Sequence, residues 1–383
     1  MKIGIDITPL AWNKKAGIGW YSYNLLKNLS KIDTENFYIL YAVSIKKYKE
    51  MKKIKEEFKQ KNFKVSIKFF SNKIYNYTVQ TFIPIEFYHG KFDIIHTLHP
   101  FSPVNILGKQ VITIHDITPL INPDWFLPLH YEKFKFIILR AVKRVDKIIA
   151  DSFSTKNDLI NYFKLNSEKI DVVYLAPSEI YKKLEDKEKI ENVKKKYGIT
   201  KKYLLFVGTI EPRKNIIRLI DAFILIKNKI PELQLVICGQ IGWKSEIFYK
   251  KMAEIPEKIT KDIILTGYVP IYEMPYLYNG CEVFVYPSLY EGFGLPVIEA
   301  MACGVPVITS NISSLPEVAG NAGILVNPYN IEEIVYAIEK ILTNVELRNE
   351  LINKGLERAK LFSWEKTAKE TLEIYKRLKK EVV

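Results

Sequence analysis

Short apolar runs alternate along the chain with longer segments whose apolar residues recur every three or four positions. The short runs are rich in Val, Ile and aromatic residues, which is typical of strands. Because they lack a clean alternation of polar and apolar positions, they predict a parallel sheet covered by helices on both faces. In the first half the strand-like runs cover residues 2–7, 37–43, 64–70, 92–97, 109–116, 146–151 and 171–175, and the helical segments cover 19–31, 46–60, 130–144 and 154–163.

A polar and charged stretch at about residues 178–200, SEIYKKLEDKEKIENVKKKYGITKK, interrupts this alternation. It predicts a linker with one surface helix, and therefore a domain boundary. After it the same alternation restarts, and residues 330–383 have a helical pattern throughout. The predicted fold class is α/β, with two tandem doubly wound Rossmann-like domains whose ligand binds in the cleft, at the carboxyl ends of the strands. The strand-like runs of the second domain are YLLFVG, LQLVICG, DIILTG, EVFVYP, VPVIT and GILVN.

Length and composition restrict the class of protein. A chain of 383 residues with 48% hydrophobic and 26% charged residues can form two globular domains with separate cores. No charge-free apolar run reaches the ~18 residues that a membrane span needs. The N-terminal sequence lacks a secretory apolar segment because Asp6 interrupts it. Cys238, Cys281 and Cys303 lie far apart in apolar surroundings, so we expect buried, reduced thiols in a cytoplasmic protein.

The charge is strongly basic and unevenly distributed. The net charge is +14, and the first 100 residues contain 17 lysines, no arginine and 8 acids. A basic surface attracts phosphates, anionic lipid or nucleic acid, although scattered lysines also serve solubility. No zinc-finger spacing or aromatic–basic alternation accompanies the charge, so a nucleic-acid partner is not expected. The segment 46–60 predicts a packed surface helix, with a membrane-surface helix as the alternative.

The stretch YLLFVGTIEPRKNIIRLIDAF (203–223) combines a strand ending at Gly208, a loop, and a helix from about Asn215. Arg213 and Lys214 lie in the loop just before the helix. A helix N-terminus carries roughly half a positive charge, so two cations beside it predict an anion site. Arg suits bidentate phosphate contact and Lys acts as a point charge. Taken alone, the pair would be better explained as solvated loop cations.

A second stretch, SLYEGFGLPVIEAMACGVPVI (288–308), changes that interpretation. It predicts a loop that carries Glu291, followed by a helix that carries Glu299 about one turn from its start. Pro296 suits the first helical turn, where its missing N–H costs nothing. Singly, each acid is equally well explained as a solvated loop glutamate or as a helix-start glutamate favoured by the helix dipole.

Together, the two acids indicate a particular class of ligand. Gly292 and Gly294 let the backbone approach a ligand closely and turn its N–H groups toward it. Carboxylates bind paired hydroxyls, and backbone N–H groups bind phosphate. A nucleotide diphosphate-sugar offers ribose hydroxyls, a diphosphate and sugar hydroxyls in that order, so the stretch predicts a site for such a molecule.

This constellation resembles the retaining glycosyltransferases of family 4, which have the GT-B fold, and the resemblance covers nearly the whole chain. Its strongest element is the pair Glu291-x7-Glu299 within EGFGLPVIEAMACGVPVI. TIHDITPL (113–120) is similar to a His-Asp segment of mannosyltransferase-like members. Further similarities are VGTIEPRKN (207–215) to the diphosphate site, GIGWYSYNLLKNLSKID (17–33) to the N-terminal glycine loop and helix, and FSWEKTAKETLEIYKRL (362–378) to the final helix that crosses back to the first domain. The domain boundaries predicted with it are 1–178, 179–361 and 362–383.

The resemblance implies a role for each matching residue. Glu299 would hold the ribose hydroxyls and Glu291 the donor sugar hydroxyls. Arg213 and Lys214 would bind the diphosphate and stabilise it as it leaves, and His115 would lie beside the sugar across the cleft. The further donor-binding positions are Gly17 and Gly19 in the loop over the phosphates, Gly208, Tyr268 and Val269 near the base, and Gly292, Phe293, Gly294 and Leu295 along the sugar and diphosphate. The glycine loop of the family often has an Arg nearby, whereas this chain has Trp20 and Tyr21, which puts any contact through that Arg in doubt.

Three histidines lie at predicted strand ends. Considered by itself, His115 is more often a structural or capping residue than a ligand contact, and the resemblance is what favours a role at the sugar. Asp116 would orient it or cap a turn. His96 and His99 are weaker candidates for contacts to the acceptor.

We expect catalysis without a cofactor or a divalent metal. The chain has no Asp-x-Asp motif, and its nearest approach, Asp186-x-Glu188, lies in the charged linker. Hard cations need clustered carboxylates, and cationic side chains take over their role here. The expected reaction is retaining transfer of a sugar, with GDP-mannose favoured as donor, to a saccharide acceptor, expected to be lipid-linked, for cell-surface polysaccharide or glycolipid. The basic first domain and the aromatic stretch 72–90 suggest peripheral contact with an anionic membrane at its inner face.

Other functions stay open to different degrees. Within the same fold they are a UDP-sugar-dependent transferase, a nucleotide-sugar hydrolase and an enzyme with a sugar-phosphate acceptor. From another class, a non-catalytic nucleotide-sugar-binding protein is the alternative. A dinucleotide oxidoreductase would need G-x-G-x-x-G, but AGIGWYS has Ser22 in place of the third glycine, so we reject this class.

Overall fold

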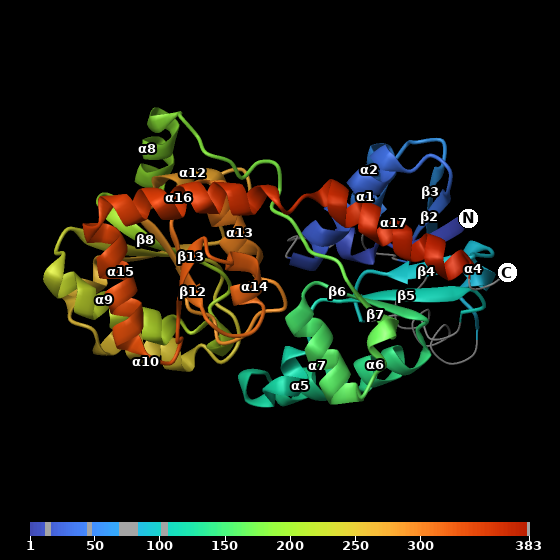
Figure 1. Cartoon of the computed structure of the whole chain (residues 1–383), viewed down its shortest axis with the longest axis horizontal. Coiled ribbons are helices and arrows are strands. Elements are labelled where there is room, and N and C mark those ends of the chain that lie inside the picture. The colour runs from blue at the N-terminus through green and yellow to red at the C-terminus, as the bar shows by residue number, and fades with distance from the viewer. Residues whose placement is uncertain (12–16, 44–47, 69–82, 101–105, 381–383) are drawn as a thin grey trace. The chain divides into compact units, whose positions relative to one another are not determined.

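The computed structural model describes residues 1–11, 17–43, 48–68, 83–100 and 106–380 (Figure 1). The chain forms two compact units. The first comprises Met1–Ile117, Glu132–Leu175 and Ser363–Val383, and the second comprises Thr118–Tyr131 and Ala176–Phe362. The segment Thr118–Tyr131, which the predicted boundaries place in the first domain, thus groups with the second unit. Within that unit the Trp243 indole N–H donates to the Trp125 carbonyl at 2.6 Å.

The first unit contains a sheet of seven described strands, all paired in parallel. The strand order reverses between β1 and β4, so the sheet is doubly wound. Strands β4 and β5 are buried almost throughout, which explains why their sequences are continuous apolar runs. In sheet order the strands are β3 (Phe63–Lys68), β2 (Phe37–Val43), β1 (Lys2–Asp6), β4 (Ile94–Thr97), β5 (Lys109–Ile114), β6 (Lys147–Ala150) and β7 (Ile170–Val172).

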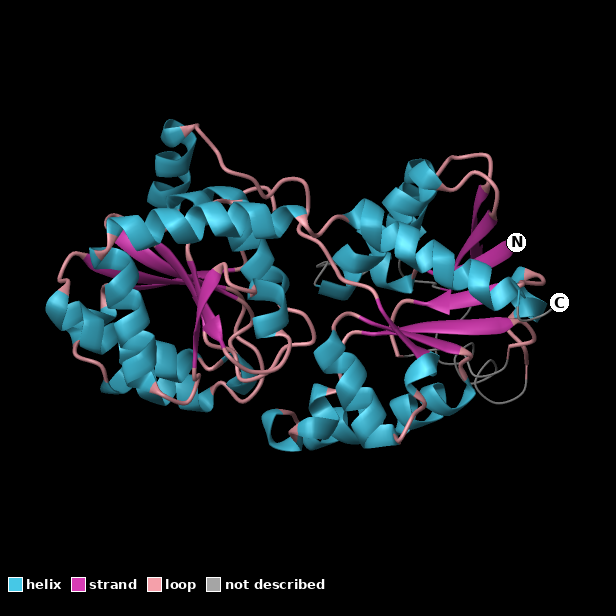
Figure 2. Cartoon of the chain, in the orientation of Figure 1, coloured by secondary structure: helices cyan, strands magenta, loops and turns pink. Residues whose placement is uncertain are grey.

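Helices cover this sheet, as Figure 2 shows. The final helix, α17, packs along α1 in the first unit, and Thr367 anchors it by donating to the Tyr174 carbonyl at 2.7 Å. Ile54 of α2 and Phe58, which follows the helix, are buried, so the expected packing of segment 46–60 is confirmed at these two residues. The helices are α1 (Gly17–Ile32), α2 (Tyr48–Glu57), α4 (Glu86–His89), α6 (Pro128–Arg144), α7 (Phe153–Phe163) and α17 (Trp364–Lys380), of which α6 begins in the segment grouped with the second unit.

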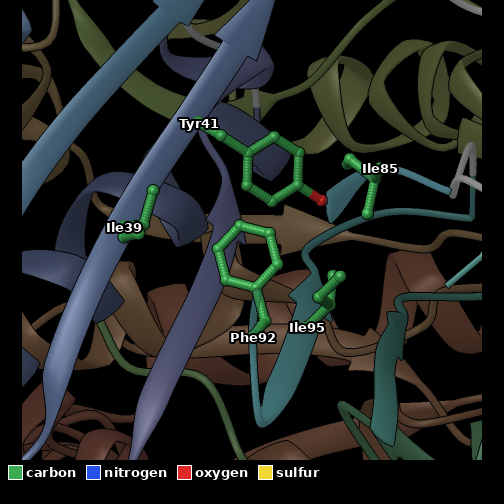
Figure 3. Close-up of a cluster of buried hydrophobic side chains, with 5 residues drawn as sticks. All are labelled: Ile39, Tyr41, Ile85, Phe92 and Ile95. Atoms are coloured by element: carbon green, nitrogen blue, oxygen red, sulfur yellow. The ribbon is translucent and has the colours of Figure 1, made fainter. Parts of the chain in front are cut away.

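An apolar cluster fixes the packing around β1, β2 and β4. Figure 3 shows its five residues, Ile39, Tyr41, Ile85, Phe92 and Ile95, all of them buried. A Cβ on Gly4 of β1 would lie 2.7 Å from the ring of Phe92, so only glycine leaves room for this ring. Each large apolar side chain buried in this way stabilises the fold by about 1.5–3 kcal/mol.

The second unit repeats the same design with six described parallel strands. Its strand order reverses between β8 and β11. Residues in β9, β11 and β12 are buried throughout, again as continuous apolar runs. In sheet order the strands are β10 (Ile263–Gly267), β9 (Leu233–Cys238), β8 (Lys202–Val207), β11 (Val283–Tyr286), β12 (Val307–Ser310) and β13 (Gly323–Val326). Each strand predicted from the sequence, in both halves, is present in the structure.

The helices of the second unit pack in pairs, α9 against α15 and α13 against α16. Asn330 and Asn344 cap α15 and α16 by accepting backbone N–H groups of their first turns. The helices are α5 (Thr118–Ile121), α8 (Lys187–Lys196), α9 (Ile216–Lys229), α10 (Glu246–Glu254), α11 (Glu257–Thr260), α12 (Met274–Gly280), α13 (Leu295–Ala302), α14 (Leu315–Ala319), α15 (Ile331–Thr343) and α16 (Val345–Lys360). Because β8 and β11 are neighbours, the loops that follow them meet at the point where the strand order reverses.

Candidate active site

The loop after β8 is fixed by one asparagine. Asn215 has left-handed backbone geometry, with φ of 58°, and its side-chain amide donates to the carbonyls of Pro287 at 2.9 Å and Pro328 at 2.7 Å. These two prolines follow β11 and β13. The preceding turn, Pro212–Lys214, is therefore held against the ends of two other strands, which gives the cations of the loop a defined position.

The loop after β11 is fixed from the segment between β12 and α14. Ser314 donates to the carbonyls of Glu291 at 2.9 Å and Phe293 at 2.8 Å, and Ser313 accepts from the Glu291 N–H at 3.1 Å. Gly294 has φ of 104°, and a Cβ there would lie 2.7 Å from the Leu315 side chain. Pro296 lies in the first turn of α13, as predicted. These contacts fix the backbone of the loop at Glu291.

Glu291 joins the two loops through both of its carboxylate oxygens. Oε1 accepts from Lys214 Nζ at 2.6 Å, and Oε2 accepts from Arg213 at 2.7 Å. Oε1 also accepts from the hydroxyls of Ser288 at 2.6 Å and Tyr286 at 2.9 Å. Glu291 is therefore an acid whose hydrogen-bonding capacity is largely used by residues of its own unit.

A second acid completes this group. Glu211 is buried and accepts from the other terminal nitrogen of Arg213 at 2.7 Å. We call Glu211, Arg213, Lys214, Tyr286 and Glu291 the cation–carboxylate cluster. Its two cations and two carboxylates balance in charge, which offsets the high cost of removing four charges from water.

The charges of the cluster shift the pKa values of its own members. Burial alone would raise the pKa of Glu291, but the charges of Arg213 and Lys214 outweigh burial and lower that pKa to about 2. Burial and the adjacent Arg213 charge lower the pKa of Lys214. The carboxylate is thus ionised at any physiological pH.

Glu299 lies on α13 and has different partners. Its carboxylate accepts from Tyr278 at 3.1 Å and is hydrogen-bonded to Tyr181. Burial raises its pKa to about 7, because two phenol hydroxyls only partly replace the water that an ionised carboxylate would have. The structure thus brings Arg213, Lys214 and Glu291 into direct contact and holds Glu299 with a tyrosine pair.

In the first unit, His115 follows β5 and Asp151 follows the neighbouring strand β6. His115 Nδ1 lies 2.6 Å from Asp151 Oδ2, and Nε2 lies 3.1 Å from the Leu98 carbonyl. The Tyr21 ring packs edge-on against the imidazole, with ring centroids 4.8 Å apart. Burial opposes charge on the imidazole, but Asp151 outweighs it and raises the pKa of His115.

His96 belongs to a buried hydrogen-bond chain. Its Nδ1 lies 2.6 Å from the Tyr375 hydroxyl and its Nε2 lies 2.8 Å from the Thr113 hydroxyl, which lies 2.9 Å from the Tyr21 hydroxyl. Burial lowers the pKa of His96 to about 3. Being fully buried, His96 is a core residue in this structure, and His99 is also buried, with Nε2 3.4 Å from an Asp6 oxygen.

The remaining predicted positions lie in the loops at strand ends or at helix starts. Gly17 and Gly19 form the first turn of α1, and the residues just before it, 12–16, lie outside the described part of the chain. Tyr268 and Val269 follow β10, with Tyr268 half exposed. Phe293 packs against Phe362 with ring centroids 5.8 Å apart. Gly208 follows β8, Gly292 lies beside Glu291, and Leu295 begins α13.

Sequence reasoning missed Glu211, Tyr286, Ser288 and Asp151. A signal for two of them existed, since Ser288 and Asp151 are polar residues just after apolar strands, where parallel sheets place ligand-binding groups. Tyr286 lies in a fully buried strand, so its hydroxyl needed a partner. Glu211 lies two residues before Arg213, but nothing in the sequence distinguishes a salt bridge there from solvation.

The structure also bears on the cysteines, on groups of metal-ligating side chains and on membrane-spanning helices. All three cysteines are buried and free, as expected, and burial raises the pKa of Cys238 to about 12. Among the described residues, no three His, Cys, Asp or Glu side chains form a group that could hold a metal ion. In the same residues, every helix is too short or too polar to cross a membrane.

Comparison with known proteins identifies relatives for both units. Residues 17–176 match the family described as Glycosyltransferase Family 4, and residues 187–358 match Glycosyl transferases group 1. The chain is 34% identical over 275 residues to O-antigen chain mannosyltransferase B of Escherichia coli, covering 71% of each protein. It is 33% identical over 297 residues to the serotype-specific mannosyltransferase WbdA of E. coli, covering 77% of this chain and 36% of that longer protein.

Solved structures share the fold at lower sequence identity. Anabaena HepE in complex with UDP-glucose is 16% identical, superposes with a TM-score of 0.75, and is covered over its full length by 98% of this chain. At that identity the likeness shows the fold alone, which is the two-domain GT-B arrangement of Rossmann-like units.

Proposed function

The chain belongs to the group 1 glycosyltransferases of the GT-B fold, in their mannosyltransferase-like branch, and from this premise we propose that it transfers mannose from GDP-mannose to a saccharide acceptor with retention of configuration. The observation that carries the proposal is the cation–carboxylate cluster at the strand-order reversal of the second unit. Arg213 and Lys214 are held there within 2.7 Å of Glu291. A sugar diphosphate is the ligand class that needs two fixed cations beside a hydroxyl-binding acid.

The chemistry follows from where charge develops. As the bond between C1 of the sugar and the diphosphate oxygen breaks, its electron pair stays on the diphosphate, and Arg213 and Lys214 stabilise the new charge. The acceptor hydroxyl forms its bond to C1 on the same face, and its proton passes to the departing phosphate oxygen. The products are the extended saccharide and GDP. The two protein cations supply the charge that a divalent metal supplies in other transferases, so we propose a metal-independent reaction without a cofactor.

Binding of the donor divides between two carboxylates. Glu291 places a carboxylate beside the two cations of the diphosphate site. Its Oε2 accepts from Arg213 and has a second lone pair, which we propose accepts from a sugar hydroxyl. Glu299 holds the ribose hydroxyls, with the backbone at Tyr268 and Val269 near the base. On the family resemblance alone, we also propose Gly17, Gly19 and His115 of the first unit as contacts of the donor.

The acceptor assignment rests on charge and on the relatives. The E. coli relative is an O-antigen chain mannosyltransferase, which supports a polysaccharide acceptor, and we propose that this acceptor is lipid-linked. The first 100 residues carry a surplus of nine positive charges, which favours a cytoplasmic enzyme bound peripherally to the anionic inner face of a membrane. Ile54 and Phe58 of the segment 46–60 are buried and therefore do not support a membrane contact, and residues 72–82 of the aromatic stretch lie outside the described residues, so the proposal rests on charge.

A ligand screen followed by a transfer assay tests the proposal. Thermal-shift measurements with GDP, UDP, ADP and their sugars should show a specific rise with GDP and GDP-mannose, and transfer should persist in EDTA. A rise with UDP alone would move the donor to the UDP-sugars, as in the HepE complexes. Binding without transfer to any saccharide acceptor would support the non-catalytic alternative. Sedimentation with liposomes of graded anionic-lipid content tests the membrane contact, which independence from lipid charge would contradict.

A further inference from the structure

The imidazole of His115 is enclosed by hydrogen-bond acceptors. Its Nδ1 faces Asp151 Oδ2 at 2.6 Å, and its Nε2 faces the carbonyl oxygen of Leu98 at 3.1 Å. From this geometry we propose that His115 is held as a doubly protonated imidazolium by Asp151, which makes Asp151 a positioning residue and removes His115 as a general base. The functional part of this inference rests on the proposed function, whereas the protonation state does not.

The two hydrogen-bond partners of His115 exclude both of its neutral tautomers when Asp151 is ionised. A carbonyl oxygen only accepts, so Nε2 must carry a proton to bond Leu98. With that tautomer and an ionised Asp151, the lone pair of Nδ1 would face a carboxylate lone pair at 2.6 Å, which is repulsive. With the opposite tautomer, Nε2 would face the carbonyl without a proton. The contacts are satisfied only when a second proton lies between Nδ1 and Oδ2.

That second proton belongs on the imidazole. Ordinary imidazole binds a proton more tightly than a carboxyl group, by more than two pKa units. Burial raises the pKa of Asp151, but the charge and hydrogen bond of His115 oppose that rise. Asp151 is 2% exposed, and its other oxygen, Oδ1, is buried without a hydrogen-bond partner among the described residues. A buried carboxylate without other donors needs a cation beside it, and His115 is the one positioned to provide it.

The neighbouring titratable groups do not remove the charge. Asp116, next in the chain, favours the imidazolium. Burial, together with the Asp151 charge, raises the pKa of the Tyr21 hydroxyl, which keeps this phenol neutral. A charge on His96 would compete with a charge on His115, but the His96 pKa of about 3, lowered by burial, leaves it neutral above acid pH. Packing of the Tyr21 ring edge against the imidazole completes the enclosure.

A permanent imidazolium limits what His115 can do. It has no free lone pair, so it cannot take the proton of an acceptor hydroxyl. Its positive charge can stabilise negative charge on a sugar or phosphate oxygen, while its Nε2 proton stays bonded to the Leu98 carbonyl. The proton of the acceptor must then go elsewhere, which agrees with a leaving phosphate that acts as the base.

The protonation state can be measured directly in the intact protein. The chain has five histidines, so ¹⁵N-labelled histidine spectra resolve each imidazole, and His115→Gln assigns the His115 signals by their loss. We expect both ring nitrogens of His115 to stay protonated from pH 6 to 9. A single protonated nitrogen at pH 7.5 in the wild type would overturn the proposal, and this test needs no folded variant of Asp151.

Variants of Asp151 test whether this carboxylate holds the second proton on His115. In Asp151→Asn, His115 should lose its second proton within the range from pH 6 to 9, and Asp151→Glu should restore the charge at least in part. Asp146→Asn is the matched control, because Asp146 precedes the same strand and pairs with Lys109 at 2.8 Å at its other end. Unchanged His115 protonation in a folded Asp151→Asn would contradict the role of Asp151. A change in His115 protonation in Asp146→Asn would contradict it as well.

Activity gives the second measurement. In the wild type, His115 should cause no change in turnover between pH 6 and 9, because it stays doubly protonated over that range. Turnover of Asp151→Asn should fall roughly tenfold for each unit that the pH exceeds the new pKa of His115, because the protonated fraction falls by that factor. A doubly protonated His115 with no detectable transfer by the wild type would sink the proposed function and leave the protonation state standing. If His115 titrates in Asp151→Asn but turnover of that variant does not change with pH, the charge on His115 has no role in turnover.

Discussion

Lys214 and Glu291, which are 77 residues apart in the sequence, form a direct ion pair with 2.6 Å between Nζ and Oε1. The pair exists because β8 and β11 are neighbours and their following loops meet. Each loop is anchored separately, by Asn215 on one side and Ser314 on the other. The fold therefore places a cation and an acid in direct contact.

Replacing Lys214 by Ala should lower the rate of sugar transfer by about 10²–10³, because a fixed donor to the leaving diphosphate is lost. The measurement is turnover at saturating donor. Lys227→Ala is the matched control, since Lys227 is equally buried and pairs with Asp262 at 2.6 Å elsewhere in the same unit. Turnover of Lys214→Ala within tenfold of the wild type would refute its role.

Replacing Glu291 by Gln should destabilise the second unit at neutral pH by about 3–5 kcal/mol, because buried Lys214 loses its carboxylate partner and Arg213 loses one of its two. The folded-state pKa of Glu291, about 2, is depressed below its ordinary value of 4.5, so its stabilisation is present above pH 4.5 and is lost as the pH falls toward 2. Urea denaturation of both proteins at a series of pH values measures this. A constant difference between them from pH 7 to pH 2 would show that the ion pairs do not carry the stability.

The sequence predicted the strands well and the contacts of the site unevenly. Buried parallel strands such as β9 are apolar on both faces, and that pattern is local and readable. The meeting of Lys214 with Glu291 was also predictable, because the carboxyl ends of strands gather at one edge of a sheet. The pairing of His115 with Asp151 requires β5 and β6 to be neighbours, which no local pattern encodes.

Other features depend on packing between distant segments. The grouping of residues 118–131 with the second unit rests on contacts such as that of Trp125 with Trp243, 118 residues away. Glu299 differs from Glu291 because Tyr278 and Tyr181 are its partners, and neither tyrosine is marked by any motif. Its raised pKa was therefore beyond the reach of sequence analysis.

Donor affinity should depend on pH through Glu299. Its pKa of about 7 means that the carboxyl group is protonated in the free enzyme below that pH. If the ionised form holds the ribose, affinity for the nucleotide should rise roughly tenfold per pH unit well below pH 7 and level off above it. Calorimetry in buffers of different ionisation enthalpy should detect proton release at pH 6.

Glu299→Gln is the control for that measurement. It should bind more weakly by about 1.5–3 kcal/mol at pH 8, as expected for a lost charged hydrogen bond, and its affinity should not change between pH 6 and 8. Equal affinity of wild type and variant at pH 8, or the same pH dependence in both, would remove Glu299 from the donor site.

Asn215 combines a backbone role with a side-chain role, and variants separate them. Asn215→Gly keeps the left-handed geometry without strain but loses three side-chain hydrogen bonds, two donated to Pro287 and Pro328 and one accepted from Arg218, so it should lose about 1–3 kcal/mol of stability. Asn215→Ala should lose roughly a further 1 kcal/mol, because alanine resists a φ of 58°. Denaturant unfolding gives both values. Equal stability of Asn215→Gly and wild type would show that the amide does not hold the loop.

The hydroxyl of Tyr375 should hold the final helix in the first unit. Tyr375 is fully buried, and its only change in Tyr375→Phe is loss of the hydroxyl 2.6 Å from His96 Nδ1. Because His96 is itself fully buried, its nitrogen would remain without that partner, which should lower the free energy of unfolding of the first unit by about 1–3 kcal/mol. Hydrogen exchange of α17 and β4 should accelerate, while exchange in β8 and β11 should not. Tyr336→Phe, at a position that is 64% exposed on α15, provides the control and should change neither. Unchanged exchange of α17 in Tyr375→Phe would mean that apolar packing against α1 holds the helix without this hydrogen bond.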